Sequence, residues 1–282
     1  MNLQRQVIDA ELRCVFSEAC QPEFAATHLR EGVIRDIYAT NKIDFSSWLP
    51  ESFLNAVSKA NINGGIISGL AWKDPSLQEM NNLAIDDIIQ RSHIPMKGFF
   101  MPAFQKNEVD WFREASEVNR DKYVGFEVIP KWHGVGLESQ KLNKLIRLAI
   151  DMNVYVKVYT CHITQPFQGN NAIETFKMIF EYPDAKFIIP HLGGLLPFYQ
   201  LDSRYRKRLS ECLFLGSVSS TMKMCQYCMD INSSNILFAS DYPFNHCCSI
   251  TEVVDSVKGL DLSEPQRNAF FYSNAKRAFD MQ

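Results

Sequence analysis

Phe187-Ile188-Ile189-Pro190-His191-Leu192-Gly193-Gly194 decides the fold, together with a matching stretch later in the chain, Ile236-Leu237-Phe238-Ala239-Ser240-Asp241-Tyr242-Pro243-Phe244. Each is a short apolar run that stops at one ionisable residue. Such runs, bounded by turn formers, are typical of strands buried on both faces, as in parallel sheets. The ionisable residue then lies at the carboxyl end of its strand, where barrels and open α/β sheets bind ligands. We therefore predict that His191 and Asp241 are catalytic.

Strand-like runs alternate with segments of helical periodicity along the whole chain. The predicted strands are Val7–Asp9, Gly65–Ser68, Lys97–Met101, Tyr123–Ile129, Val154–Tyr159, Lys186–Ile189, Leu213–Gly216 and Ile236–Ser240. This alternation predicts an α/β fold, a parallel eight-stranded (β/α)8 TIM-type barrel. The length of 282 residues suits one such domain, covering residues 1–282. Residues 14–50 lack a clear strand, so we expect them to form an excursion over the C-terminal mouth.

Composition indicates an ordinary globular protein. The chain is 46% hydrophobic and 22% charged, with a formal net charge of -3, which argues against a disordered or nucleic-acid-binding protein. The basic run Arg204–Arg208 predicts a solvated helix face. The polar N-terminus lacks the apolar core of a signal peptide, and no apolar run is long enough to span a membrane. We therefore expect a cytoplasmic protein without a nucleic-acid or membrane partner.

The chain resembles the amidohydrolase-related family of the metal-dependent hydrolase superfamily (amidohydrolase 2 type). The motifs that carry the resemblance are Val7-Ile8-Asp9, Gly64-Gly65-Ile66, Asn81-Asn82-Leu83-Ala84, Gly125-Phe126-Glu127-Val128-Ile129-Pro130, Pro190-His191-Leu192-Gly193-Gly194, Ser240-Asp241-Tyr242-Pro243 and Asn274-Ala275-Lys276-Arg277-Ala278-Phe279. The resemblance implies a (β/α)8 barrel that hydrolyses C–N or C–O bonds, hydrates double bonds or decarboxylates small acids, usually with one divalent metal. It also leaves a homodimer open.

The resemblance implies a particular set of metal ligands. These are a His-x-His pair ending the first strand, a His ending the fifth and the Asp ending the eighth, while the sixth-strand His contacts substrate or metal. A divalent ion held in this way lowers the pKa of a bound water to about 7 and so generates hydroxide.

This chain departs from that pattern at two strands. Where Asp-x-His-x-His is expected, it has Asp9-Ala10-Glu11-Leu12-Arg13. The Arg13 guanidinium stays protonated, so next to a metal position it would repel the cation. Tyr159 stands where the fifth-strand His is expected, and His162 follows three residues later.

Two alternatives follow for this degenerate metal site. In one, Glu11, His162, His191 and Asp241 form a mixed oxygen and nitrogen site for one divalent metal, zinc or manganese. In the other, Arg13 takes the place of the cation, pairs with Asp241 or Glu11, and the site is metal-free. The charge of Arg13 favours the metal-free alternative.

Several further residues are candidates for substrate binding. Arg13 can bind a substrate carboxylate bidentately, while His133, Tyr159 and Trp72 follow or end strands and face the predicted mouth. Glu127, within the fourth strand, would need a buried partner such as Lys157 or Arg13.

The predicted partner is therefore a small-molecule substrate. His191 and Asp241 can act as an acid and base pair, so we expect a hydrolase, or a decarboxylase or other lyase, acting on a small carboxylated or amide-bearing metabolite. The alternative is a catalytically silent barrel that binds a ligand or a partner protein.

Overall fold

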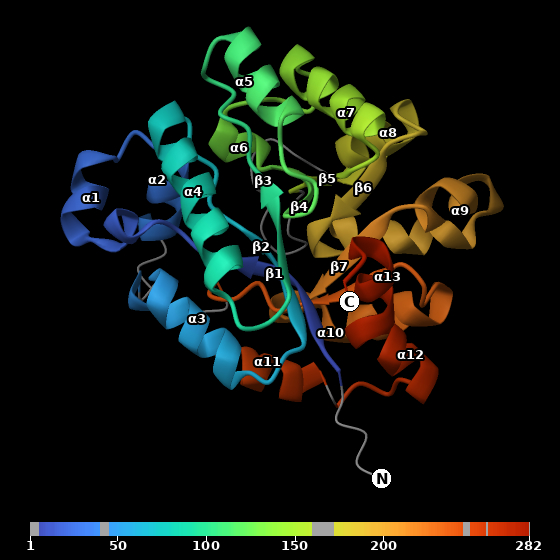
Figure 1. Cartoon of the computed structure of the whole chain (residues 1–282). Coiled ribbons are helices and arrows are strands. Elements are labelled where there is room, and N and C mark those ends of the chain that lie inside the picture. Colours follow the sequence, from blue (N-terminus) through green and yellow to red (C-terminus); the bar gives the residue numbers. More distant parts are fainter. Residues whose placement is uncertain (1–5, 40–44, 160–171, 245–248, 258, 282) are drawn as a thin grey trace.

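The chain folds into a (β/α)8 barrel, as the computed structural model shows (Figure 1). The structure describes residues 6–39, 45–159, 172–244, 249–257 and 259–281. Its eight strands are all parallel and lie in sequence order, β1 to β8. A backbone bridge between Leu12 and Tyr242 brings β1 next to β8 and closes the ring. The predictions of the fold class and of the eight strands are confirmed.

Helices separate the strands along the chain. The strands are β1 Ile8–Arg13, β2 Gly64–Ser68, β3 Met96–Phe100, β4 Tyr123–Val128, β5 Tyr155–Val158, β6 Lys186–Ile189, β7 Leu213–Ser217 and β8 Ile236–Ala239. The α-helices are α1 Pro22–Thr27, α2 Gly32–Ala39, α3 Pro50–Lys59, α4 Pro75–Arg91, α5 Glu108–Ser116, α6 Pro130–His133, α7 Gln140–Met152, α8 Ala172–Glu181, α9 Ser203–Ser210, α10 Val218–Ile231, α11 Ile250–Val257, α12 Glu264–Asn268 and α13 Asn274–Phe279. Short 3-10 helices are η1 Ser17–Cys20, η2 Phe45–Trp48, η3 Pro190–Gly194 and η4 Leu196–Leu201, and η5 Ala269–Ser273 is a π-helix. Within the described ranges, no helix is long and apolar enough to cross a membrane.

Helix α7 illustrates why the outer layer forms. Its apolar residues recur at spacings of three and four and are buried against the barrel. The side chain of Ser139 caps its first turn by accepting the N–H of Leu142. Asn153 ends it in the left-handed conformation, with φ 56°. The sequence therefore encodes both the position and the orientation of this helix.

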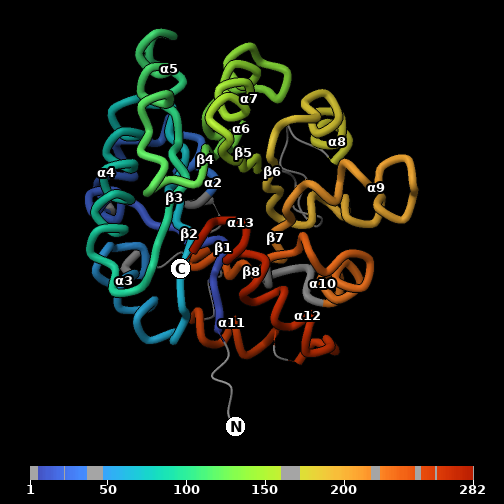
Figure 2. Tube along the Cα trace, turned by 45° about the vertical axis from the view of Figure 1, so that its right-hand side comes forward, coloured from blue at the N-terminus to red at the C-terminus, as the bar shows by residue number. Residues whose placement is uncertain are grey.

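An apolar layer fills the amino-terminal half of the barrel interior. Inward-facing residues such as Ile8, Ile188 and Leu237 pack together there with Phe279 of α13. Figure 2 shows α13 lying beside β1 and β8. Because this end is closed by apolar side chains, polar groups of the interior gather at the other end, where the strands finish.

The excursion after β1 packs over the carboxyl ends of the first strands. Phe16, Val33 and Trp48 are buried in one cluster with side chains that follow β2 and β4, including Trp72 and Trp132. The described part of the excursion contributes η1, α1, α2 and η2 to this layer. We call the buried side chains of this cluster the roof; they cover the carboxyl end of the barrel, where the polar residues lie.

The prediction of a solvated face for the basic run in α9 is wrong for Arg208. Its side chain is buried and donates to the carbonyl oxygens of Ile179, Tyr182 and Ala185, each at 2.9 Å. A guanidinium can satisfy several carbonyls in one planar fork, so this residue joins α9 to the end of α8.

Candidate active site

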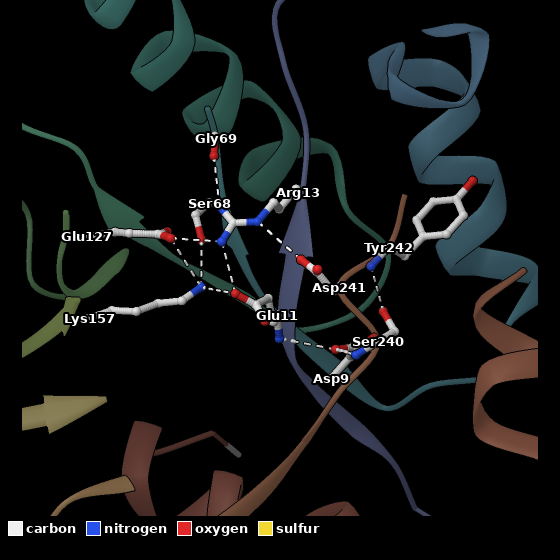
Figure 3. A network of polar contacts seen from close by, with 10 residues as sticks. All are labelled: Asp9, Glu11, Arg13, Ser68, Gly69, Glu127, Lys157, Ser240, Asp241 and Tyr242. Carbon is white, nitrogen blue, oxygen red and sulfur yellow. Dashed lines mark hydrogen bonds and ion pairs between the residues drawn. The ribbon is translucent and has the colours of Figure 1, made fainter. Parts of the chain in front are cut away.

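A buried ion-pair network centred on Arg13 lies near the carboxyl ends of the strands (Figure 3). Nη2 of Arg13 donates to Oε1 of Glu11 and Oε1 of Glu127, both at 2.9 Å. Its Nη1 donates to the carbonyl oxygen of Gly69 at 3.0 Å, and its Nε to Oδ1 of Asp241 at 3.3 Å. All the hydrogen-bonding nitrogens of this side chain are therefore bound by groups of the protein itself.

Lys157 of β5 is the second cation of the network. Its Nζ lies 2.8 Å from Oε1 of Glu11, 3.4 Å from Oε1 of Glu127 and 3.4 Å from Oγ of Ser68. The predictions that Glu127 requires Lys157 or Arg13, and that Arg13 pairs with Glu11 or Asp241, are confirmed. Two cations and two glutamates thus balance one another in the barrel interior.

A β-bulge in β1 aims Glu11 into this network. The register with β2 slips between Asp9 and Leu12, so that Ala10 packs in the interior cluster while the next residue, Glu11, also points inward. Bulges commonly re-aim side chains next to functional sites. Oδ1 of Asp9 accepts the N–H groups of Glu11 at 3.1 Å and of Ser240 at 2.9 Å. Asp9 therefore fastens the bulge to the end of β8.

The cations keep the two glutamates ionised. Burial alone would raise the pKa of Glu11, but the charges of Lys157 and Arg13 lower it to about 2. Burial likewise opposes ionisation of Glu127, whose pKa is nevertheless lowered by Arg13 and Lys157. The pKa of Arg13 is raised, because Glu127 and Glu11 outweigh the effect of burial. The network is held together as charged groups.

The two aspartates behave in the opposite way. Burial, followed by the charge of Glu11, raises the pKa of Asp241 to about 8 although Arg13 opposes the shift. Burial raises the pKa of Asp9 to about 7. The raised pKa favours the protonated form of Asp241, which can donate a proton. Its side chain is 12% exposed, whereas the side chains of Arg13 and Glu11 are 0% exposed.

His191, separated from β6 by Pro190, is held in an unusual backbone conformation. Its φ is 125° and that of the next residue, Leu192, is 33°, both in the region that favours glycine. Strain of this kind persists only where the surrounding structure imposes it, and it concentrates at functional sites. Asp241 also has a positive φ, 55°. The His191 ring packs edge-on against Tyr159, with centroids 4.7 Å apart.

Three of these side chains are suitable ligands for a metal. Among the described residues, Glu11, His191 and Asp241 each offer one ligand atom, and the three atoms lie within 4.8 Å of one another. One imidazole nitrogen and two carboxylate oxygens suit manganese or zinc, so the set supports at most one divalent ion. Glu11, however, is already bound by Arg13 and Lys157, which repel a metal cation.

The other predicted residues occupy different positions around the network. Tyr159 and Phe244 pack over the Arg13 guanidinium, each ring centroid 5.8 Å from its central carbon. The indole N–H of Trp72 donates to Asn81 at 3.2 Å. His133 is buried after β4, which lowers its pKa to about 3, and its Nδ1 accepts the N–H of Ile129. His162 lies outside the described residues.

Sequence reasoning missed the β1 bulge, the clamp made by Asp9 and the aromatic contact of Phe244 with Arg13. The bulge leaves no local signal, because it is defined only by pairing with β2. Asp9 stands at the start of the altered motif, but its partner Ser240 is 231 residues away. The pairing of Lys157 with a buried carboxylate was predictable, since a lysine inside an apolar strand needs a buried partner.

Solved structures with the same architecture include known decarboxylases. A 5-carboxyvanillate decarboxylase from Novosphingobium aromaticivorans, complexed with manganese, has a TM-score of 0.78 and 16% identity, with 100% of this chain and 98% of that chain covered. A dihydroxybenzoic acid decarboxylase from Polaromonas sp. JS666, with bound manganese, has a TM-score of 0.71 and 16% identity, covering 98% and 97%. A candidate amidohydrolase from Staphylococcus aureus has a TM-score of 0.65 and 15% identity, covering 98% and 100%.

Neither a protein-family model nor a curated protein matches the chain. The likeness to solved structures therefore concerns the fold. At this level the predicted (β/α)8 architecture is confirmed, because the chain shares the fold of these solved structures over nearly its whole length.

Proposed function

We propose that the chain is a lyase that decarboxylates a small carboxylated molecule at Asp241 and His191. The observation that carries this proposal is their convergence: both follow strands of the barrel at its carboxyl end, and their ligand atoms lie within 4.8 Å of each other. Asp241 is also the member of the Arg13 network whose side chain is partly exposed. Decarboxylase activity in the manganese-bound structures of the same fold supports the choice of reaction.

The chemistry assigns a proton donor. Decarboxylation breaks the bond between the carboxyl carbon and its neighbour, releases carbon dioxide and leaves the electron pair on that neighbour. This carbon must then take a proton. Asp241 can supply it because its pKa of about 8 keeps it protonated at neutral pH; a proton from solvent then restores it. His191 would contact and orient the substrate from the end of β6, two strands away.

We propose further that this site works without a metal. An ion bound to the oxygens of Glu11 or Asp241 at about 2.1 Å would lie within about 5 Å of the Arg13 nitrogens, which are 2.9 and 3.3 Å from those oxygens. Repulsion between a divalent ion and one such unit charge is on the order of 6 kcal/mol at an effective dielectric constant of about 20. Lys157 adds to this repulsion.

Arg13 and Lys157 would then supply the positive charge near the substrate carboxylate. Tyr159 and Phe244, which pack over Arg13, would form an aromatic wall suited to a flat acid. Hydroxylated benzoic acids, including 2,6-dihydroxybenzoate and 5-carboxyvanillate, are therefore the first substrates to test.

The test is carbon dioxide release from these acids, with and without a chelator, by protein whose metal content is determined by elemental analysis. We expect turnover that survives the chelator and is lost in Asp241→Asn. A surface variant with the same chemical change, Asp86→Asn, should retain full activity. Turnover that requires added manganese would overturn the metal-free site, and absence of turnover with every acid would overturn the lyase assignment.

One observation favours a second candidate, a catalytically silent barrel that binds a ligand or a partner protein. The excursion covers the strand ends with buried apolar side chains such as Phe16, Val33 and Trp48, and His191 is only 1% exposed. Saturable binding of an acid, seen by calorimetry without any product, would support this alternative.

A further inference from the structure

Helix α2 is attached to the roof of the barrel by two carboxylates, one just before its first residue and one a turn into the helix. Oε2 of Glu31, just before the helix, accepts the N–H of Lys73 at 2.7 Å, and Oε1 accepts the N–H of Asp74 at 3.1 Å. Oδ2 of Asp36, one turn into the helix, accepts the indole N–H of Trp132 at 2.7 Å and lies 2.8 Å from Nζ of Lys131.

The two carboxylates hold segments that follow different strands. Lys73 and Asp74 belong to the connection between β2 and α4, whereas Lys131 and Trp132 belong to α6, which follows β4. Helix α2 therefore bridges two loops of the barrel mouth. In Figure 1 it lies between α1 and the barrel, on the side of α4 and α6.

The first turn of α2 contributes apolar side chains to the roof. Val33 and Ile34 are buried in the roof cluster, and Gly32 packs closely on Trp132, where an added Cβ would lie 3.6 Å from the ring. The larger aromatic side chains of this cluster, such as Trp48 and Trp72, belong to other segments. The polar attachments of Glu31 and Asp36 therefore act beside the apolar contacts of Val33 and Ile34 in holding α2.

The attachment is also linked to the Arg13 network. The connection that Glu31 holds begins at Gly69, whose carbonyl oxygen accepts Nη1 of Arg13. On the other side, α6 carries His133. Trp132 of α6, which Asp36 holds, packs against Phe244 with ring centroids 6.2 Å apart, and Phe244 lies over the Arg13 guanidinium. Movement of α2 would therefore release contacts on two sides of the Arg13 network.

We propose that α2 is a mobile cap over the barrel mouth. The hydrogen bonds and the ion pair of Glu31 and Asp36 break together, and their loss opens a route from solvent to the Arg13 network at the carboxyl end of β1. A helix that carries both carboxylates transmits the loss of one attachment to the other. Opening of this kind is a local equilibrium with a lower free energy than global unfolding. The proposal does not depend on which molecule the site binds or on whether it is converted.

Amide hydrogen exchange tests the coupling. The N–H groups of Lys73 and Asp74 are bound by Glu31, so they exchange when that attachment breaks. In Asp36→Asn, which weakens only the other attachment, we expect their exchange to accelerate by about ten-fold, as for the loss of a charge-assisted hydrogen bond. The matched control is Asp86→Asn, which removes an ion pair with Lys122 elsewhere on the barrel and should leave these amides unchanged.

A second readout in the same variants tests access. Cys14 directly follows Arg13, is 0% exposed, and donates its thiol to the carbonyl of Trp48. Its alkylation, followed by mass spectrometry, should accelerate in parallel in Asp36→Asn. Unchanged exchange at Lys73 and Asp74 would overturn the coupled cap, and accelerated exchange without faster alkylation of Cys14 would overturn the route to the site. Neither result depends on catalytic turnover, so failure of the cap is distinguishable from failure of the proposed reaction.

Discussion

Replacing Arg13 with methionine tests whether the network is an obligatory balance of charges. The variant Arg13→Met keeps a long side chain and leaves Lys157 as the partner that the described residues provide in ion pairs with Glu11 and Glu127, all fully buried. One carboxylate must then take up a proton. At pH 7, protonating a glutamate with an ordinary pKa of 4.5 costs about 3.4 kcal/mol. This agrees with the loss of about 3–5 kcal/mol expected when a buried ion pair is broken.

The loss in free energy of unfolding caused by Arg13→Met should depend on pH in a defined direction. The protonated glutamate of the variant has a folded-state pKa above its unfolded value, so the native state binds a proton that the unfolded chain releases. Stability relative to the parent protein therefore falls as the pH rises above 4.5. The loss should shrink from about 3 kcal/mol at pH 7 to about 1 kcal/mol at pH 5.

Urea unfolding at pH 5, 6 and 7, followed by circular dichroism, measures these differences. Adding Glu127→Gln to Arg13→Met removes the surplus charge and should restore much of the stability at pH 7. The control is Arg208→Met, which removes another buried guanidinium but one held by carbonyl oxygens; its loss should not vary between pH 5 and 7. A pH-independent loss in Arg13→Met, or no recovery in the double variant, would refute the charge-balance reasoning.

Three further predictions concern the strands around the network. The pKa of Asp9 is raised to about 7, so the native state retains a proton that the unfolded chain releases, and the free energy of unfolding falls as the pH rises. Relative to the parent protein, the free energy of unfolding of Asp9→Asn should therefore increase by about 3 kcal/mol between pH 5 and pH 8. Urea unfolding measures this difference, and a difference that does not change with pH would contradict the reasoning. Arg13→His replaces the cation with an imidazole beside Glu11 and Asp241, so it should bind one equivalent of manganese or zinc in calorimetry, whereas the parent protein should bind less tightly. Gly125→Ala places a Cβ 2.0 Å from the carbonyl oxygen of Tyr155 in the neighbouring strand, so thermal unfolding should show a loss above about 4 kcal/mol or no folded protein; near-parent stability would mean that β4 and β5 can separate.

The local pattern of apolar and polar residues was sufficient to predict the order of strands and helices in the barrel. Apolar residues predominate in strands such as β6, and alternate members face the interior, as Ile188 between Phe187 and Ile189 illustrates. The same alternation, with the strand direction, placed His191 and Asp241 at the carboxyl end. Glu127 and Lys157 were expected to be buried partners, because ionisable residues inside apolar strands require compensation.

The sequence by itself thus determined which segments form strands and which ionisable residues they carry to one end of the barrel. Only the tertiary structure decided how those residues pair. Arg13 and Asp241 are separated by 228 positions and meet because β1 closes against β8, while Glu11 faces the interior because a bulge shifts β1 by one residue against β2. Side-chain periodicity acts over neighbouring residues, whereas charge pairing, desolvation and the pKa of each acid depend on the register of strands that are remote in sequence.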